Sequence, residues 1–351
     1  MKAPELKIGN RAVGPGHPVY VIAELSGNHG QSYERALELV RVAKSAGADA
    51  VKLQTYTADT ITLACDNEHF RIKGTIFDGR TLHDLYGEAF TPWEWQPALK
   101  REAEALGLQC FSSPFDFTAV DFLERMEVPA YKIASFELND LPLLRKVAAT
   151  GKPVILSTGM ATLDEVDEAV AALREGGCSQ VALLKCTSAV PAPFSEMNLR
   201  AMPMLAERYG VVTGLSDHSN GVAIPVAATA LGASIVEKHL KLSKGDTGPD
   251  VSFSLDADEF AAMVAAVRAA EQALGTGEWK LAESDATTRQ FRRSLFAAHD
   301  IRAGEAFTAE NVRSIRPAAG LHTRHYETLL SAKAACDIAR GTPLTLELIQ
   351  S

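Results

Sequence analysis

The sequence has few cysteines, and none stands in a spacing that would pair them. The five are odd in number and form no CxxC arrangement; they are Cys65, Cys110, Cys178, Cys186 and Cys336. This scatter argues against a disulfide framework and suits a reducing compartment. We therefore expect free thiols.

The sequence also lacks a long uninterrupted run of apolar residues. No stretch approaches the roughly 18 to 20 residues that a membrane helix needs. The first residues, MKAPELKIGN, contain no apolar core of signal-peptide length. These absences predict a soluble, cytoplasmic protein without a membrane partner.

Basic residues are in deficit. Lysine and arginine number 35 against 44 aspartates and glutamates, so the formal net charge is −9. A negative surface disfavours binding to nucleic acid. The 351 residues, 46% of them hydrophobic, are enough for one large domain and a small one.

Eight short apolar runs recur at similar intervals. Each is continuous in hydrophobicity rather than alternating, as expected for parallel strands that are buried on both faces. The runs are VYVIAEL from 19, AVKLQTY from 50, LQCFSSPF from 108, YKIASFE from 131, PVILSTGM from 153, VALLKCTS from 181, VVTGLSDH from 211 and SIVEKHL from 234.

Segments with helical periodicity separate these runs, for example YERALELVRVAKSAG and DADEFAAMVAAVRAAEQALG. Eight strand and helix alternations predict an α/β fold, a (β/α)8 TIM barrel, with a doubly wound sheet as the alternative. The segment LKIGNRAVG predicts a β-hairpin that caps the bottom of the barrel.

The pattern changes after Gly275. The polar stretch TGEWKLAESDATTRQ reads as a linker, and short strand-like segments separated by glycines follow it. We therefore predict a barrel domain with its hairpin over 1–280, a linker over 281–293 and a small β-rich domain over 294–351.

Every predicted strand ends in polar residues, which is where a barrel places its active site. Any one strand-end serine or lysine is ordinarily a turn former or a surface charge. Several lysines and hydroxyls that converge on one mouth, in an acidic protein, predict a phosphate or carboxylate site.

His218 and His239 end adjacent strands, so both imidazoles can reach one point. Two neutral imidazoles suit a divalent metal such as Mn, Co or Zn; two unrelated core histidines are the alternative. Glu24 ends the first strand and should face His239, where it could orient or deprotonate a water. A salt bridge from Glu24 to Lys52 or Lys238 is the alternative.

The sequence resembles the sialic acid synthase family along nearly its whole length. The matching motifs are AELSGNHGQ, VKLQT, FSSPFD, AYKIAS, ILSTGM, GLSDH, ALGASIVEKH, GPDVSFSL, RRSL and SIRPAAGLH. Within the family, GTIFDGRTLHDLYGEAFTPWEW and DADEFAAMVAAVRAAEQALG are most similar to the branch that makes pseudaminic acid from a 6-deoxy-altrose derivative.

The resemblance implies a TIM barrel joined to an antifreeze-like (SAF) domain, in a domain-swapped homodimer. It also implies condensation of phosphoenolpyruvate with 2,4-diacetamido-2,4,6-trideoxy-L-altrose, releasing phosphate by C–O cleavage. A divalent metal held by His218 and His239, Mn²⁺ first with Mg²⁺ or Co²⁺ as alternatives, would polarise the sugar aldehyde. Glu24 would act on the water or at the aldehyde step.

The resemblance further assigns substrate contacts. Those implied for phosphoenolpyruvate are Lys52, Lys132, Ser113, Ser135, Ser157 and Ser216. Gln54, Glu137 and Asp250 match positions that face the sugar, and Arg316 matches an arginine delivered from the partner's tail.

Two departures from the family pattern affect these expectations. KCTSAVP places Ser188 and Val190 where neuraminic acid synthases carry Asn and Tyr, and a more apolar wall suits a 6-deoxy sugar. LLSAKA places Ser331 and Ala332 where relatives tend to have Gly-Lys.

Two kinds of alternative function remain. One is the same reaction giving N-acetylneuraminate or legionaminate. The other is a non-catalytic sugar-binding protein, and the intact Glu24, His218, His239 and Lys132 argue against that second alternative.

Overall fold

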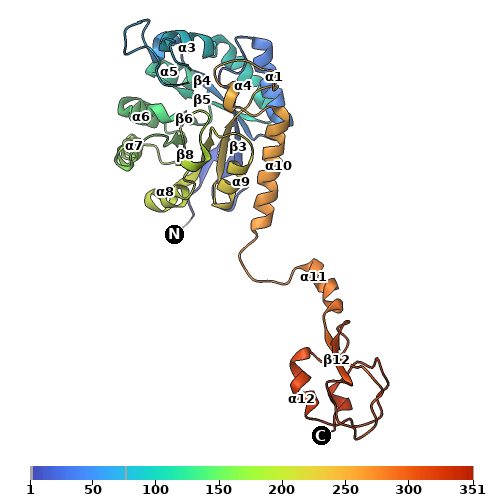
Figure 1. Cartoon of the computed structure of the whole chain (residues 1–351). Helices are drawn as coiled ribbons and strands as arrows, with labels where there is room; N and C mark the ends of the chain where they lie inside the picture. The colour runs from blue at the N-terminus through green and yellow to red at the C-terminus, as the bar shows by residue number, and fades with distance from the viewer. Residues whose placement is uncertain (1–2, 76, 351) are drawn as a thin grey trace. The chain divides into compact units, whose positions relative to one another are not determined.

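The structure is a computed structural model that describes residues 3–75 and 77–350. The chain divides into two compact units, one ending at Gly275 and the other beginning at Thr276. Figure 1 colours the chain from end to end, so each unit can be followed by residue number.

The first unit is a closed barrel of eight parallel strands, which confirms the predicted fold and rejects the doubly wound sheet. Consecutive strands are neighbours, and β10 pairs with β3 to close the ring, with His239 opposite Glu24. The strands are β3 (Tyr20–Glu24), β4 (Ala50–Thr55), β5 (Gln109–Pro114), β6 (Tyr131–Ile133), β7 (Val154–Ser157), β8 (Val181–Cys186), β9 (Val212–Asp217) and β10 (Ile235–His239).

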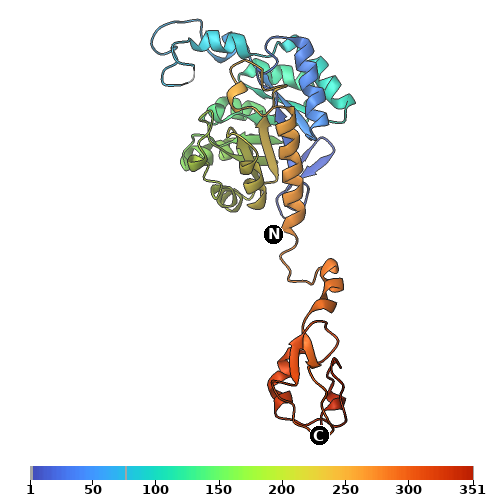
Figure 2. The same cartoon turned by 45° about the vertical axis from the view of Figure 1, so that its right-hand side comes forward.

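Helices surround the strands in both views of the barrel (Figures 1 and 2). They begin where local signals predict: the Asp256 side chain caps the longest helix and forms a reciprocal capping box with Glu259. The helices of this unit are α1 (Tyr33–Ser45), α2 (Ala58–Ile61), α3 (Leu82–Ala89), α4 (Gln96–Ala105), α5 (Phe117–Arg125), α6 (Leu141–Ala148), α7 (Leu163–Glu175), α8 (Ala201–Tyr209), α9 (Ala223–Ala230) and α10 (Ala257–Leu274).

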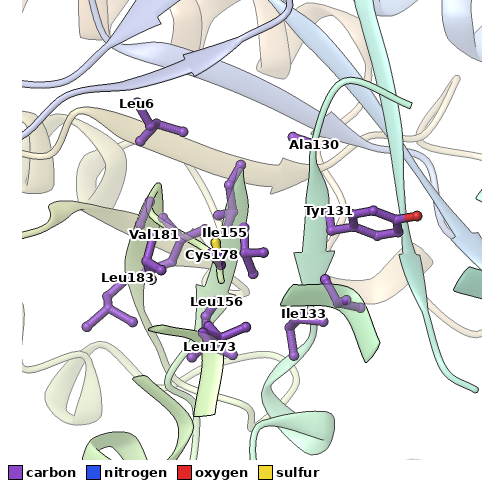
Figure 3. Packing of buried hydrophobic residues seen from close by; sticks show 14 of the residues in the cluster. Leu6, Ala130, Tyr131, Ile133, Ile155, Leu156, Leu173, Cys178, Val181 and Leu183 are labelled. Atoms are coloured by element: carbon purple, nitrogen blue, oxygen red, sulfur yellow. The ribbon is translucent and has the colours of Figure 1, made fainter. Parts of the chain in front are cut away.

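The core lies between the strands and these helices, and it continues at the bottom of the barrel, where the N-terminal hairpin lies. Figure 3 shows part of the largest cluster, in which Ile155 and Leu156 of β7 pack with Leu173 of α7. An antiparallel hairpin of β1 (Leu6–Ile8) and β2 (Arg11–Val13) adds its apolar side chains to the same cluster. Burial of this apolar surface is the main force that holds the strand ends in place.

The second unit has a small core of its own. Strands β11 (Ser294–Ala297) and β12 (Val312–Ile315) pair antiparallel, and α12 (Tyr326–Leu330) packs with them around Leu295, Phe307 and Leu344. Much of the remaining pairing consists of isolated bridges such as Ile301 with Ile338. The segment predicted as a plain linker contains a short helix, α11 (Glu283–Thr288), which lacks the apolar periodicity that would have announced it.

None of the helices in the described part of the chain is both long enough and apolar enough to cross a membrane.

Gly214 offers a test of barrel closure. A Cβ at this position of β9 would lie 2.2 Å from the backbone oxygen of Ile235 in β10. We expect Gly214→Ala to force the two strands apart and to lower the free energy of unfolding by about 3 kcal/mol or more. Gly245→Ala is the control, because the nearest atom to its Cβ would be 3.9 Å away. Equal urea midpoints for the two variants would contradict the prediction.

Candidate active site

A cavity of about 760 Å³ opens among the carboxyl ends of the barrel strands, a volume typical of small-molecule sites. Side chains two apart on one strand point to the same face, so pairs such as Lys52 and Gln54 enter it together. Most residues selected from the sequence line it: Lys52, Gln54, Lys132, Ser135, Glu137, Ser157, Ser188, Ser216, His218, His239 and Asp250.

Two lysines and a glutamate form the charged centre of this cavity. Glu237 Oε1 lies 3.0 Å from Lys52 Nζ and 3.7 Å from Lys132 Nζ, and it accepts a hydrogen bond of 3.3 Å from Ser216 Oγ. Burial alone would raise the pKa of Glu237, but the two ammonium groups outweigh it and hold the pKa below its usual value. Glu237 is therefore an anion at neutral pH.

Glu237 is among the polar residues at the predicted strand ends, but the sequence assigned it no role in the site. The signal for such a role is its spacing: it stands two residues before His239 on the same strand, so it shares the inward face. Its carboxylate bridges the lysines of β4 and β6, a contact that no sequence pattern reports.

Lys132 is almost fully buried, and its ammonium group is held by oxygen atoms. Nζ donates to Ser157 Oγ at 2.7 Å and to the Ile133 carbonyl at 3.0 Å. Burial lowers the pKa of Lys132 to about 8, although Glu237 opposes that shift. The group stays mainly protonated at pH 7, so it can bind an anionic substrate.

Glu24 is fully buried, beside the cavity rather than on its surface. It has the predicted position opposite His239 in the strand register, and it also forms the salt bridge to Lys52, 2.6 Å long, that was the alternative to a role on a water. The alternative pairing with Lys238 is wrong, because Lys238 Nζ binds Asp217 Oδ2 at 2.6 Å.

The surroundings of Glu24 change its acidity. Burial raises the pKa of Glu24 to about 7, while Lys52 lowers it and the neighbouring Glu237 raises it. Gln54 Nε2 donates to Glu24 Oε1 at 3.2 Å, and the Ser26 amide donates to the same atom at 2.8 Å. A carboxylate poised near neutral pH is suited to accept or return a proton.

His218 and His239 stand together, with ring centroids 5.3 Å apart. Nδ1 of His218 lies 2.9 Å from the Thr187 carbonyl and Nδ1 of His239 lies 3.3 Å from Ser26 Oγ. When Nδ1 carries the proton for such a bond, Nε2 keeps its lone pair. The two rings, which both line the cavity, therefore present a donor set that fits a divalent metal.

The two imidazoles differ in acidity. Burial lowers the pKa of His239 well below its usual value, and His218 lowers it further. Burial also lowers the pKa of His218, but contacts with Cys186 and the Thr187 carbonyl more than reverse this. Within residues 3–75 and 77–350, no group of three or more His, Cys, Asp or Glu side chains could hold a metal, so this pair would need water or substrate oxygens to complete a shell.

Ser135 and Ser188 meet across the mouth and share a hydrogen bond of 2.9 Å. Gly159, with φ of +46°, lies beneath them, and a Cβ there would be 2.2 Å from Ser135 Cβ. The glycine of ILSTGM is thus required by a close approach.

Ser113 and Arg316 lie outside the cavity lining, whereas Asp250 lines the cavity from the chain segment before Val251–Phe253. Ser113 Oγ is buried beside β4 and has no hydrogen-bond partner among the residues the structure describes, and it does not line the cavity. Asp250 Oδ2 accepts a long hydrogen bond of 3.4 Å from the Gly27 amide. Arg316 belongs to the second unit, where it lines a basic hollow with Arg289, Arg292 and Arg293.

His29 orders its own loop. Its Nε2 lies 3.0 Å from Thr91 Oγ1, and its Nδ1 accepts from the Gln31 amide at 3.1 Å. One ring nitrogen is therefore engaged within the loop and the other by Thr91, which precedes α4, so His29 orders these segments and has no ring nitrogen left to act as a third metal ligand.

Glu137 gives a prediction for stability. Burial, opposed by Lys132, raises the pKa of Glu137 to about 7 from an ordinary value of 4.5. The folded state holds this proton more tightly than the unfolded state, so stability is lost as the pH rises from about 4.5 to about 7. The free energy of unfolding of Glu137→Gln, taken relative to that of wild type, should therefore rise by about 3 kcal/mol between pH 4.5 and pH 8.

Urea unfolding at the two pH values measures this gain. Glu168→Gln, at an exposed position on α7, is the control and should show no such change. A pH-independent difference between Glu137→Gln and wild type would refute the prediction.

Comparisons with known proteins agree with this geometry. Residues 39–279 match the NeuB family, and residues 292–350 match the SAF domain. The chain is 49% identical to pseudaminic acid synthase of Campylobacter jejuni strain 81-176 over 93% of this chain and 95% of that protein. It is 43% identical to pseudaminic acid synthase of Helicobacter pylori over 95% of this chain and 98% of that protein.

A solved structure shows the same fold. The crystal structure of N-acetylneuraminic acid synthetase from Leptospira borgpetersenii, in complex with citrate, matches with a TM-score of 0.73 at 30% identity, over 82% of this chain and 95% of that one. Fold and sequence agree along both units, and the chain belongs to the NeuB family.

Proposed function

We propose that this protein condenses phosphoenolpyruvate with 2,4-diacetamido-2,4,6-trideoxy-L-altrose, giving pseudaminic acid and phosphate. The observation that carries the proposal is the cavity itself: Lys52 and Lys132 stand beside the paired histidines, so an anion and a carbonyl oxygen can be held next to each other. The identity to pseudaminic acid synthases over nearly the whole chain supports this choice of sugar.

In this proposal the lysines and serines at the strand ends, which form the charged floor of the cavity, bind phosphoenolpyruvate. Lys52 and Lys132 supply positive charge, while Ser157 and Ser216 supply hydroxyl donors on the neighbouring strands. Ser113, whose buried hydroxyl has no partner in the described chain, and Ser135 complete the predicted set. Several of these lysine and serine groups now form hydrogen bonds with each other or with Glu237, and a bound phosphate would replace some of those bonds with bonds to its own oxygens.

The reaction forms one carbon–carbon bond and breaks one carbon–oxygen bond. C3 of phosphoenolpyruvate attacks the aldehyde carbon of the open-chain sugar, whose oxygen takes up a proton. A water oxygen then adds at C2, and the C2–O bond to phosphate breaks. In this scheme Glu24, with its pKa near 7, accepts the proton of the water.

Protonation of Glu24 has a second effect on the site. The carboxylate then loses its charge and its ion pair with Lys52, which is now 2.6 Å long. Of its two carboxylate contacts, the ammonium of Lys52 then keeps only the one with Glu237, so more of its charge is available to the departing phosphate. Proton uptake by Glu24 and stabilisation of the leaving group are thus linked through one contact.

A divalent metal on Nε2 of His218 and His239 belongs to the proposal, with Mn²⁺ ahead of Mg²⁺ or Co²⁺. When bound, it would supply Lewis acidity toward the aldehyde oxygen. The hydrogen bonds on Nδ1 of each ring support this assignment, because they fix the rings and leave Nε2 for coordination. Gln54, Glu137 and Asp250 would hold the sugar, and Ser188 would join Ser135 beside it.

Phosphate release tests the proposed reaction. With Mn²⁺ and phosphoenolpyruvate, the protein should release phosphate with the altrose sugar, and mass spectrometry should find the nonulosonic acid. N-acetylmannosamine and the diacetamido sugar that leads to legionaminic acid run in parallel. Turnover with N-acetylmannosamine or with the legionaminic acid precursor, but not with the altrose sugar, would reject the altrose sugar as substrate. Turnover with none of the three sugars would favour a non-catalytic sugar-binding protein.

The metal is tested separately. Chelation should stop turnover, and His218→Ala should bind Mn²⁺ at least tenfold more weakly in calorimetry.

The same proposal includes a domain-swapped homodimer, in which Arg316 of one chain reaches the sugar in the other chain's barrel. The cluster of arginines around Arg316 in a small unit supports it, because such a cluster suits polar or anionic groups outside that unit. The residues of the barrel cavity include no arginine of their own among those described.

Mixing two inactive variants tests the swap. Arg316→Ala and His218→Ala should each lose activity, and refolding them together should restore roughly a quarter of wild-type activity. Half of the dimers are then mixed, and each mixed dimer has one complete site. Mixed dimers that form, by native mass spectrometry, without regaining activity would reject the exchange of arginines between chains.

A further inference from the structure

The connection between β4 and α4 is an excursion that the mechanism leaves unexplained. It runs over residues 56–95 and carries α2 and α3, and Figure 2 shows it in blue to cyan, extending beyond the ring of helices. Its apolar side chains enter the cavity that holds the charged floor. We call six residues the apolar wall: Tyr56, Ile72, Phe77, Leu85 and Tyr86 of the excursion, with Phe115 after β5.

The aromatic residues of the apolar wall pack against one another. The ring of Tyr56 makes edge contacts with Tyr86 at 5.7 Å and with Phe115 at 5.0 Å between centroids. Leu85 is buried beside them. Such aromatic contacts add to area burial and hold the three rings in defined positions, so this part of the wall is preformed, and Ile72 and Phe77 extend it along the cavity.

The wall lies across the barrel from the residues first expected to select the sugar. Strands β4 and β8 occupy opposite places in the closed order, so the β8 loop with Ser188 and Val190 forms the other side of the mouth. Ser188 keeps its hydroxyl next to Ser135 at 2.9 Å, which makes that side partly polar. The larger apolar surface is therefore on the excursion.

The carboxylates assigned to the sugar, Glu137 and Asp250, line the same cavity as the wall. Burial raises the pKa of Tyr86, and the nearby Glu137 raises it further. Burial likewise raises the pKa of Tyr56 well above its usual value, with Asp250 as the next cause. One ligand can thus touch the wall with its apolar groups and these carboxylates with its hydroxyls.

We propose that the apolar wall selects the sugar. It binds the methyl groups of a 6-deoxy, N-acylated substrate and disfavours a sugar that carries a hydroxyl group on C6. This inference rests on the proposed function. A substrate with a C6 methyl and acetamide methyls buries these groups against the wall at a gain. A hydroxyl at C6 that faces the hydrocarbon side chains of Ile72, Phe77 and Leu85 finds no hydrogen-bond partner among them, which is the kind of loss that separates close substrates.

Phe77→Ser and Ile72→Ser test the wall, because both positions are only partly buried and lie outside the barrel strands. Leu63→Ser is the matched control: it lies on the same excursion, is 63% exposed and does not line the cavity. We expect kcat/KM for the altrose sugar to fall about tenfold in the two wall variants, through KM, with KM for phosphoenolpyruvate and the urea midpoint unchanged. The control should match wild type.

The preference between substrates gives the decisive readout. The ratio of kcat/KM for the 6-deoxy sugar to kcat/KM for its 6-hydroxy counterpart should decrease in Phe77→Ser. It should keep the wild-type value in Leu63→Ser. Wild-type ratios in both wall variants, or equal losses for sugar and phosphoenolpyruvate, would overturn the role of the wall.

Failure of the proposed reaction is visible separately, in wild type. If wild type turns over a different amino sugar, the altrose substrate is rejected, and the same variants are compared with that sugar and its deacylated amine. A narrowed preference for the acylated form in Phe77→Ser then supports the wall, and an unchanged preference rejects it.

Discussion

The pairing of β10 with β3 is the constraint on which the rest of the site depends. Hydrogen bonds across this seam close the sheet and set His239 opposite Glu24, although one ends the first strand of the barrel and the other ends the last. Closure also places Lys52, Glu237 and Ser216 around one point, because each stands on the inward face of its own strand. Without the seam the polar strand ends would lie along an open edge, and no cavity would enclose them.

Closure gathers charges in a buried place, and the charges then determine one another. Glu24 and Glu237 both touch Lys52, yet their acidities diverge. Glu237 lies between two ammonium groups, and its pKa is held down, whereas burial keeps the pKa of Glu24 near 7. One glutamate is thus a permanent anion that orders the lysines, while the other can exchange a proton during a reaction.

The cavity is divided between this charged floor and an apolar wall from a single long connection. The division matches two substrates of unlike character, an anionic three-carbon acid and an acylated sugar. Because the floor uses residues at strand ends and the wall uses an excursion between strands, sugar choice can change with little effect on the chemistry below it. That arrangement offers a physical reason why one barrel serves related syntheses of different nonulosonic acids.

The sequence by itself determined the fold and most of the residues at the mouth. Continuous apolar runs and capped amphipathic helices predict the barrel, since local periodicity and burial on both faces act strand by strand. The positions of His218 and His239 at the ends of adjacent strands predicted that the two rings lie together, as they do.

Only the tertiary structure decided which groups touch across the mouth. It made Lys52 rather than Lys238 the partner of Glu24, brought Glu237 between two lysines and turned the excursion toward the cavity. These are contacts between segments far apart in the chain, and their geometry depends on closure and packing, which no local pattern encodes.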